Sequence, residues 1–350
     1  MCKVPGGIVL KRFRPEQAFF EKEALEYPLG KRMHTFLQKH SIPITIIPSH
    51  NRVTGIPGAN PMEAYRNAKR TIVVGIKRTM ELDICKPSAN YQFSLSTGCV
   101  GGCHYCYLQT TMGKKPYIRI YVNTDEIFDN LNQYIEKRAP RLTFFESSSS
   151  SDPVGVEHMT GSLKKAIEFF AKSKYGRLRI VTKFAQVDSL LDIHHNQHTR
   201  FRFSLNSDYV IRNFEQMTAT LEERIEAAGK IAQAGYPLGF ILAPIMHYEG
   251  WQDEYSYMLS HLSKTLANTS VKDLTFELIQ YRFTKAAKNI ILERFPNTKL
   301  DMDESNRKYK WGKYGRGKWV YPDEKSKELD QFIRQQIKEK FPAARVQYFT

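Results

Sequence analysis

The sequence predicts an α/β protein whose centre is a partial (β/α)6 barrel of the TIM type, flanked by an N-terminal cap and a C-terminal extension of a β-hairpin and a helix. Six short apolar runs with strand character alternate with helical periods between residues 91 and 295, and this alternation is typical of βαβ units that form a parallel sheet. No low-complexity linker interrupts the series. A chain of 350 residues, 41% of them hydrophobic, can bury the core that such a barrel requires.

The elements of the barrel follow from these runs in chain order. The predicted strands are Tyr91–Leu95, Arg141–Glu146, Leu178–Lys183, Arg202–Asn206, Leu238–Pro244 and Leu274–Ile279. The predicted helices are Thr124–Arg138, Gly161–Ser173, Val187–Ile193, Leu221–Gly235, Trp251–Leu266 and, after the last strand, Thr284–Phe295. Reactive groups of parallel α/β barrels gather at the carboxyl ends of the strands, so those ends form the expected rim of an active site.

The N-terminal region is predicted to be a cap. It combines a strand-like start at Gly7–Phe13, an amphipathic stretch over Pro15–His40 and an apolar strand at Ile42–Ile47. A short helix at Asn60–Arg70 then leads into a strand at Thr71–Ile76.

The predicted division of the chain is a cap over residues 1–84, the barrel over residues 85–300, and a nucleic-acid-binding hairpin and helix over residues 301–350. Ser326–Phe341 has the period of an amphipathic helix. We expect its apolar face to pack on the barrel and its charges to form a solvated face.

Charge and cysteine content narrow the possible partners and compartment. Lys and Arg number 52 against 36 Asp and Glu, a net charge of +16, and such a field concentrates polyanions such as nucleic acid. No apolar run approaches the ~18–20 residues that span a bilayer, and the first residues lack the apolar segment of a signal peptide. Five cysteines, three of them in one loop, do not make a disulfide framework. We expect a cytoplasmic protein.

The cysteine loop is the most informative stretch. Cys99, Cys103 and Cys106 have the spacing C-x3-C-x2-C, directly after the first barrel strand. Three thiolates on one tight loop can hold three irons of a [4Fe–4S] cluster, whereas an electron-transfer cluster normally has four cysteine ligands. The fourth iron would be open to a small molecule, which indicates chemistry more than electron storage.

Glycines in the loop support the cluster, and a structural zinc site is the alternative. Gly98, Gly101 and Gly102 allow the unusual backbone angles and close approach that a loop around a cluster needs. A zinc site would use His104 as its fourth ligand. His104 is adjacent to Cys103, however, and zinc ligands are usually separated by two or more residues.

Several predicted strand ends are polar. The second is followed by the hydroxyl-rich run 146–152, the third ends at Lys183, and the fourth contains Ser204 and Asn206. Lys183 could be a solvated lysine, but an ammonium at this rim could pair with the carboxylate of a cofactor. Local turn capping is the alternative role for Ser204 and Asn206.

A second informative stretch is Asn306–Tyr321, which interleaves cations with aromatic residues. Strand-like flanks around Gly312–Gly317 predict a hairpin. Lys and Arg at such a tip can track phosphates while an aromatic edge lies beside a base. The alternative is an exposed basic hairpin with a tryptophan pair in the core.

The C-x3-C-x2-C spacing is the signature of the radical SAM superfamily, and more of the chain resembles the spore photoproduct lyase family within it. The similarity covers about Ala24 to Thr350. It is carried by Ala24–Gly30, Cys106–Gly113, Lys115–Arg119, Thr199–Ser204, Ala234–Phe240, Phe276–Gln280 and Tyr309–Gly312.

The resemblance implies a partial barrel and a DNA repair lyase that converts the spore photoproduct, 5-thyminyl-5,6-dihydrothymine, to two thymines by 5′-deoxyadenosyl radical chemistry. It implies a [4Fe–4S] cluster and S-adenosylmethionine as cofactors. Its expected partners are lesion-bearing double-stranded DNA and an electron donor such as flavodoxin or ferredoxin, and we expect a monomer in the cytoplasm of the spore.

The resemblance also assigns residues. Positions that match those holding S-adenosylmethionine are Ser151, Lys183, Ser204, Asn206 and Ala243. The hairpin contacts to DNA are expected from Lys313, Tyr314 and Lys318.

The sequence departs from the family at the hydrogen-atom donor. The usual family pattern has a cysteine where this chain has Ser149, and a serine hydroxyl cannot readily replace it because its O–H bond is much stronger than an S–H bond. Either Ser149 is an engineered substitution that impairs repair, or another group donates. With three cysteines assigned to iron and Cys2 near a terminus, Cys85 is the candidate donor, although it could be a packed hydrophobic residue.

Tyr105 and Tyr107 match family tyrosines proposed to relay the radical back to the cofactor. Their alternative role is aromatic packing around the cluster.

Two other functions fit parts of the sequence. A radical SAM enzyme that modifies another nucleic acid, such as a tRNA base, would share the cysteine loop; the lack of a second cysteine cluster argues against the methylthio-transfer type. A nucleic-acid-binding module with a zinc ion or a cluster would share the loop and the basic hairpin without being an enzyme.

Overall fold

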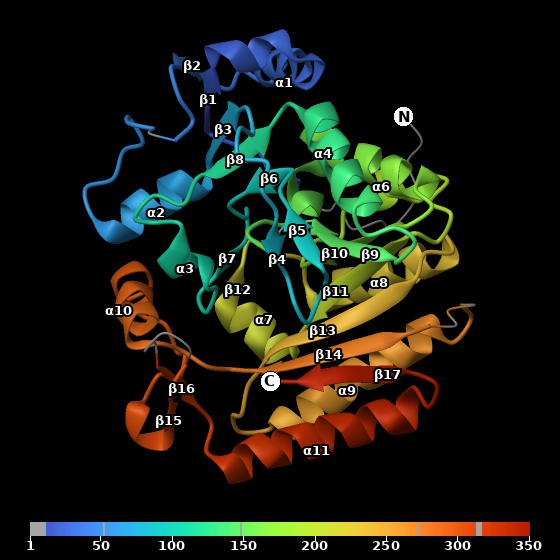
Figure 1. The fold of residues 1–350 in the computed structure, drawn as a ribbon. Coiled ribbons are helices and arrows are strands. Elements are labelled where there is room, and N and C mark those ends of the chain that lie inside the picture. Colours follow the sequence, from blue (N-terminus) through green and yellow to red (C-terminus); the bar gives the residue numbers. More distant parts are fainter. Residues whose placement is uncertain (1–11, 52, 148, 270, 272, 313–316) are drawn as a thin grey trace, which may run out of the picture.

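The computed structural model of the protein describes residues 12–51, 53–147, 149–269, 271, 273–312 and 317–350 (Figure 1). A curved central sheet lies between an N-terminal sheet at the top of the view and a C-terminal hairpin and helix at the bottom. Among the described residues, no helix is both long enough and apolar enough to cross a bilayer.

The central sheet confirms the predicted partial barrel. Its strand order is β17-β14-β13-β11-β10-β9-β5-β4, and the six predicted strands pair in parallel in that order. They are β5 (Tyr91–Phe93), β9 (Thr143–Ser147), β10 (Gly176–Thr182), β11 (Thr199–Leu205), β13 (Leu238–Ile245) and β14 (Thr275–Gln280). Two edge strands were not predicted, namely the antiparallel β4 (Asp83–Ile84) and the parallel β17 (Arg345–Phe349). The two residues of β4 are exposed, and β17 alternates exposed and half-buried residues over most of its length, so neither strand has a continuous apolar run.

Helices cover the outer face of this sheet (Figure 1). The helix α6 packs on β10 and β11, α8 packs on β11 and β13, and α11 packs on β14. The helices of this region are α4 (Thr124–Glu136), α5 (Glu157–Thr160), α6 (Ser162–Lys172), α7 (Asp208–Phe214), α8 (Leu221–Gln233), α9 (Trp251–Leu266), α10 (Lys285–Arg294) and α11 (Asp323–Lys340). Each of α4, α6 and α8 buries one apolar stripe, which is the periodicity that predicted it.

One predicted helix is wrong. Val187–Ile193 forms only a short 3-10 turn at Asp188–Leu190. The connection from β10 to β11 is rich in Asp, Ser, His and Asn, whose side chains favour turns because they compete for backbone hydrogen bonds.

The inner face of the sheet is charged. Because strand side chains alternate between faces, Leu178 and Ile180 face the helices while Arg202 of β11 lies inside with Glu146 of β9 and Glu277 of β14. The Arg202 guanidinium is 2.6 Å from Glu146 and 2.7 Å from Glu277, and all three side chains are buried. Such buried charges are tolerated because they are paired.

The N-terminal sheet has the strand order β2-β1-β3-β8-β6. Its strands are β1 (Gln17–Glu21), β2 (Ile44–Ile47), β3 (Thr71–Gly75), β8 (Ile118–Tyr121) and β6 (Ser96–Thr97). The strands β6 and β8 come from beyond residue 84, so a continuous sheet joins the cap to the segment of the cysteine loop. The division at residue 84 stays a prediction.

The predicted amphipathic stretch from Pro15 to His40 is wrong in its first part. Gln17–Glu21 forms β1, and only Pro28–Lys39 forms a regular helix, α1, after a 3-10 turn. A strand that is paired in parallel on both edges is buried and has no polar face to distinguish it. The predicted β2, β3 and α2 (Pro61–Lys69) are confirmed, whereas most of Gly7–Phe13 lies outside the described residues.

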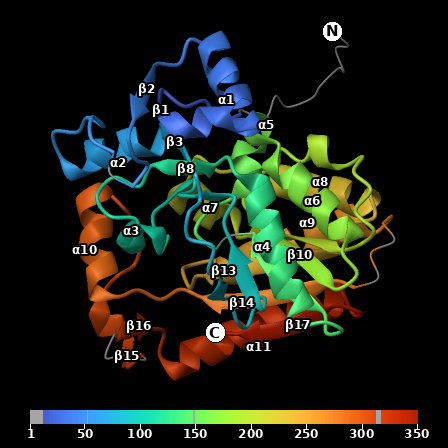
Figure 2. The same ribbon diagram turned by 45° about the horizontal axis from the view of Figure 1, so that its top comes forward.

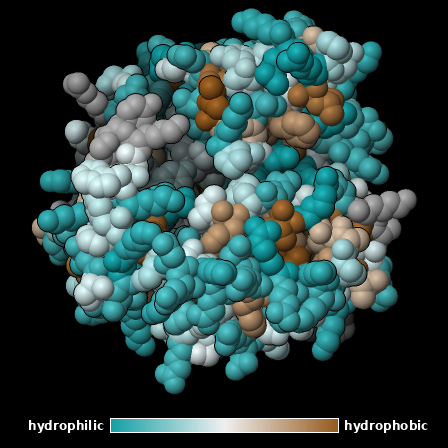
Figure 3. Space-filling model, turned by 60° about the horizontal axis from the view of Figure 1, so that its bottom comes forward, coloured by the Kyte–Doolittle hydropathy of each residue, from teal (hydrophilic) through white to brown (hydrophobic). Residues whose placement is uncertain are grey.

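The C-terminal extension is confirmed as a hairpin and a helix. The strands β15 (Lys308–Lys310) and β16 (Lys318–Val320) pair in antiparallel register. The helix α11 buries Leu329, Ile333 and Ile337, and its charged residues lie mainly at the surface. On the face that Figure 3 shows, hydrophilic side chains predominate and the hydrophobic ones form separate patches.

The helix α10, from the C-terminal part of the chain, packs on helices from the N-terminal part. It packs against α2 and against α3 (Leu108–Thr111), which follows the cysteine loop (Figure 2). The cysteine loop is therefore held between the cap, the barrel and α10.

Candidate active site at the carboxyl ends of the barrel strands

The cysteine loop leaves β6 and passes through β7 (Gly102–Cys103) before α3. The strand β7 pairs with β12 (Glu215–Gln216), which places Cys103 opposite Glu215. Gly98 has a φ of +78°, and a Cβ there would lie 2.4 Å from the Tyr117 carbonyl oxygen. Only glycine fits this turn, as the sequence predicted.

The three thiols lie in a cradle that suits a cluster. Cys103 is buried, and Cys99 and Cys106 are partly exposed. The Gly101 amide donates to Cys99 Sγ at 3.3 Å. Burial raises the pKa of the Cys99 thiol to about 12, while the nearby Lys69 opposes this shift. A cationic neighbour and an N–H···S bond both favour the thiolate form that binds iron.

The environment of His104 speaks against a zinc site. Its ring stacks on Phe295 with centroids 4.0 Å apart, and its Nδ1 shares a hydrogen bond with Thr298 at 2.9 Å. Burial lowers the pKa of His104 to about 4. Within the described ranges, no three His, Cys, Asp or Glu side chains are grouped to hold one ion. Three cysteines that each bind a different iron do not need to converge on one point.

Glu215 links the cysteine loop to the barrel. Its carboxylate accepts hydrogen bonds from the Tyr105 hydroxyl, from Lys183 Nζ at 2.8 Å and from Arg224 Nη2 at 2.5 Å. Burial alone would raise its pKa, but Arg224 and Lys183 hold the pKa of Glu215 at about 2. The carboxylate is therefore ionised at neutral pH, and the three charged groups together carry one positive charge. No sequence motif marks Glu215 or Arg224.

Lys183 is not the solvated lysine that the sequence left open. Its side chain is 19% exposed, and its ammonium lies 2.8 Å from Glu215 and 3.0 Å from the Tyr105 hydroxyl. It is also not a lone cation. Because Arg224 shares the same carboxylate, Lys183 keeps charge available for a second anion.

Three of the other residues predicted to hold the cofactor line the same rim. Ser151 accepts from Ser96 Oγ at 3.1 Å, and the Ser204 carbonyl accepts from Arg224 at 2.9 Å. The Ala243 carbonyl lies 3.5 Å from Lys183 Nζ. The structure thus brings the ends of β9, β10, β11 and β13 together around one region.

Asn206 is held within the protein. Its side-chain amide donates to the Pro244 carbonyl at 2.8 Å and accepts from the Ser207 amide at 3.0 Å and from the Tyr255 hydroxyl at 2.7 Å. These bonds favour the turn-stabilising role that the sequence left open, and a contact from Asn206 to the cofactor stays a prediction.

Tyr107 is 54% exposed, and its hydroxyl donates to the Ser149 carbonyl. Partial burial of this hydroxyl raises the pKa of Tyr107 to about 12, and Cys106, Glu146 and Cys85 contribute. The relay from Cys85 through Tyr107 stays a prediction.

The Cys85 thiol is held in its protonated form. The residue is partly buried in the turn between β4 and β5. Burial, together with Glu146, raises the pKa of Cys85 to about 12. At neutral pH it carries the S–H bond that a hydrogen-atom donor requires. The Ser149 hydroxyl contacts Gln92.

The C-terminal hairpin presents paired cations and aromatic rings. Lys318 lies opposite Lys310, and Tyr309 lies opposite Trp319. Like charges at directly opposed positions destabilise a hairpin, and a bound anion would reduce the repulsion between Lys310 and Lys318. Trp311 is 73% exposed. The predicted contacts Lys313 and Tyr314 lie outside the described residues.

Comparison with known proteins identifies the family. The model of the spore photoproduct lyase family matches residues 13–350. The chain belongs to this family. Curated spore photoproduct lyases from Geobacillus sp. (strain Y412MC61) and Bacillus subtilis (strain 168) are 54% and 52% identical, over 97% of this chain and 100% and 99% of theirs.

Solved structures of spore photoproduct lyase agree with the fold. A variant with bound AdoMet and dinucleoside spore photoproduct is 55% identical and superposes with a TM-score of 0.94, covering 97% of this chain and 100% of the other. A spore photoproduct lyase complexed with the dinucleoside spore photoproduct has the same identity, coverage and TM-score. Both confirm the curled parallel half-barrel.

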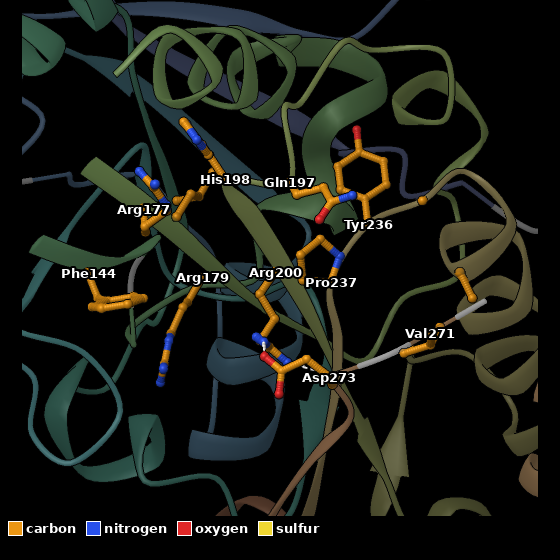
Figure 4. A pocket seen from close by; sticks show the side chains of 13 residues that line it. Phe144, Arg177, Arg179, Gln197, His198, Arg200, Tyr236, Pro237, Val271 and Asp273 are labelled. Carbon is orange, nitrogen blue, oxygen red and sulfur yellow. Dashed lines mark hydrogen bonds and ion pairs between the residues drawn. The ribbon is translucent and has the colours of Figure 1, made fainter. Parts of the chain in front are cut away.

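A separate cavity of about 620 Å³ opens at the amino ends of β10, β11 and β13, at the opposite end of these strands from the rim. Figure 4 shows Arg177 and Arg179 pointing in different directions and Arg200 pointing to Asp273. Arg177 also donates to the Gly176 carbonyl at 2.7 Å. Because its cations do not converge, we assign no ligand to this cavity.

We predict that Cys99, Cys103 and Cys106 are the protein ligands of the cluster. Replacing any one of them with alanine should remove most of the iron and abolish cleavage of S-adenosylmethionine, as measured by iron analysis and 5′-deoxyadenosine formation after anaerobic reconstitution. Cys85→Ala is the matched control and should keep both. A cluster-cysteine variant with full iron and normal cleavage would contradict the assignment.

Proposed function

We propose that this protein is a DNA repair lyase that returns the spore photoproduct to two thymines by 5′-deoxyadenosyl radical chemistry. The observation that carries the proposal is the loop of three cysteines beside a rim on which Glu215, Lys183 and Arg224 together carry one positive charge. Relatives more than 50% identical that bear the name spore photoproduct lyase support it. A [4Fe–4S] cluster with S-adenosylmethionine at its open iron would supply the radical when reduced.

The residues of the rim have distinct proposed roles. Cys99, Cys103 and Cys106 hold three irons. Lys183 attracts the carboxylate of S-adenosylmethionine, because the ion cluster with Glu215 and Arg224 has one positive charge in excess. The burial of this cluster strengthens the attraction, since water screens it little.

We propose Cys85 as the hydrogen-atom donor. The product radical takes the hydrogen atom of the Cys85 S–H bond, which leaves a thiyl radical on sulfur. A hydrogen atom then passes from 5′-deoxyadenosine through Tyr105 and Tyr107 to the Cys85 sulfur, which restores the S–H bond and leaves the radical on the 5′-deoxyadenosyl carbon. The raised pKa of Cys85, which keeps its S–H bond intact, and the hydrogen bond from Tyr107 to Ser149 support this sequence of transfers.

A solved relative gives further support. The variant of spore photoproduct lyase with bound AdoMet and dinucleoside spore photoproduct has one cysteine replaced with alanine and one serine replaced with cysteine. The two exchanged positions are separated by the same number of residues as Cys85 and Ser149. This matching separation supports Cys85 as the residue that replaces the family cysteine at Ser149.

We predict that Cys85→Ala keeps cofactor cleavage but loses clean thymine formation, because the substrate radical is then trapped as adducts. Product analysis on the dinucleotide lesion measures this. Adding Ser149→Cys to Cys85→Ala should restore thymine formation. Clean repair by Cys85→Ala at the parental rate excludes Cys85, and improved repair by Ser149→Cys alone favours the engineered substitution.

We propose that the hairpin binds the lesion-bearing duplex. Lys310 and Lys318 form a cationic pair at its strands, and Trp311 is exposed beside them. Lys313 and Tyr314 stay predicted contacts from the sequence. A damaged base pair is easier to turn out of the stack, so an aromatic edge beside a cationic strand pair fits the task.

The double variant Lys310→Gln/Lys318→Gln should bind duplex DNA more weakly and with a flatter salt dependence, by ~1 in slope for each lost phosphate contact. Its cleavage of S-adenosylmethionine without DNA should not change. Titrations at several salt concentrations measure this, with Lys327→Gln/Lys338→Gln on α11 as the matched control. If the hairpin variant bound duplex DNA with the affinity and salt slope of the parental protein, the proposal would be wrong.

An electron donor completes the proposed function. We propose that a carrier such as flavodoxin or ferredoxin reduces the cluster. A cavity of about 610 Å³ borders the cysteine loop at Val100. Arg12, Arg14 and Arg70 line it, together with Glu223 and with Glu16, which pairs with Arg70. The excess of cations in this lining suits an acidic carrier. A cytoplasmic location in the spore and a monomeric state remain predictions from the sequence.

A further inference from the structure

Arg307 is a buried arginine in a cage of aromatic rings. Its side chain has no exposed surface. The guanidinium carbon lies 3.9 Å from the centroid of Tyr321, 5.4 Å from Tyr281 and 5.9 Å from Phe283. We call these three rings the aromatic cage. In the sequence Arg307 belongs to the basic stretch taken as a DNA contact, but its burial removes it from the surface that phosphates could reach.

The cage joins both ends of the hairpin to each other. Arg307 directly precedes β15, and Tyr321 directly follows β16. The stacking of Arg307 on Tyr321 therefore closes the base of the hairpin with a contact between side chains, next to the three backbone pairs of its strands.

The same cage joins the hairpin to the rim of the barrel. Tyr281 and Phe283 follow β14 directly, and the Tyr281 amide donates to the Ile245 carbonyl at the end of β13 at 2.9 Å. Phe283 and Trp319 exchange backbone hydrogen bonds of 3.1 and 2.7 Å. The Tyr321 hydroxyl accepts from the His247 amide at 3.0 Å. The base of the hairpin is thus tied to the carboxyl ends of β13 and β14.

Asp301 and the aromatic cage together compensate the buried charge of Arg307. Asp301 accepts from Arg307 Nη2 at 3.0 Å, whereas Nε and Nη1 have no hydrogen-bond partner within the described residues. A buried cation is costly unless it is compensated. Aromatic faces provide compensation, and the planar guanidinium stacks on them in a way that a lysine ammonium does not.

We propose that Arg307 is a positioning residue, which fixes the orientation of the hairpin relative to the active-site rim. This inference rests on the proposed function, in which the hairpin opens the duplex while the rim receives the lesion. Repair of a lesion within a duplex requires the hairpin and the rim to be correctly placed relative to each other. A free dinucleotide lesion needs no opening, so it should depend on Arg307 far less.

The experiment compares two substrates across matched variants. Arg307→Met and Lys327→Met each remove one positive charge, but Lys327 is exposed on α11, outside the hairpin. Arg307→Lys keeps the charge without the planar group. Repair is measured on a duplex oligonucleotide carrying the lesion and on the dinucleotide lesion, together with amide hydrogen exchange over Lys308–Val320 and the melting temperature.

For Arg307→Met and Arg307→Lys, we expect kcat/KM on the duplex to fall about tenfold, or ~1.4 kcal/mol, and kcat/KM on the dinucleotide to change by less than about twofold. Amide exchange of the hairpin should accelerate in both variants. Lys327→Met should change the duplex value by less than about threefold, because it alters only an exposed residue outside the hairpin.

Three results would overturn the inference. They are an unchanged duplex value in the Arg307 variants, equal losses on both substrates, and a loss in Lys327→Met as large as in Arg307→Met. The failure of the proposed function is a separate outcome, because it would appear as no repair of either substrate by the parental protein or as full duplex affinity in Lys310→Gln/Lys318→Gln.

Discussion

The buried carboxylate of Glu215 is the interaction on which the active site depends. It binds Tyr105 of the cysteine loop, Lys183 at the end of β10 and Arg224 of α8, and its own strand pairs with Cys103. Removing one partner of such a network would leave charges buried and unpaired, which is strongly destabilising. The buried ion pairs of Glu215 with Lys183 and Arg224 therefore fix the position of the cysteine loop relative to the rim of the barrel.

Charge pairing also shapes the barrel below the rim. The Glu146, Arg202 and Glu277 side chains fill the inner face of the sheet, where an open half-barrel lacks the apolar layers of a closed one. Cys85 lies near this group, where burial and, to a smaller extent, the carboxylate of Glu146 raise the pKa of its thiol. The proposed donor therefore borders the buried charges of the interior.

The sequence predicted the features that repeat or cluster locally. The six parallel strands, the cysteine loop and the hairpin each have a signal within a few residues. The strand β1 was missed because a buried strand has no alternation. Glu215 could not be predicted, since its partner Tyr105 is 110 residues away and only folding brings them together. For the same reason the sequence predicted Arg307 to be a surface cation, because the rings of its aromatic cage come from separate segments of the chain.

Binding of S-adenosylmethionine to Glu215→Gln tests most directly whether this carboxylate organises the site. Anaerobic titration of the reconstituted variant should show affinity weaker by about tenfold or more, because the neutral amide no longer holds Lys183 in place beside the cysteine loop, a loss of position that outweighs the added positive charge. Glu223→Gln, on the same helix as Arg224 but in its N-terminal cap, should bind like the parent. Parental affinity and cleavage in Glu215→Gln would contradict the account.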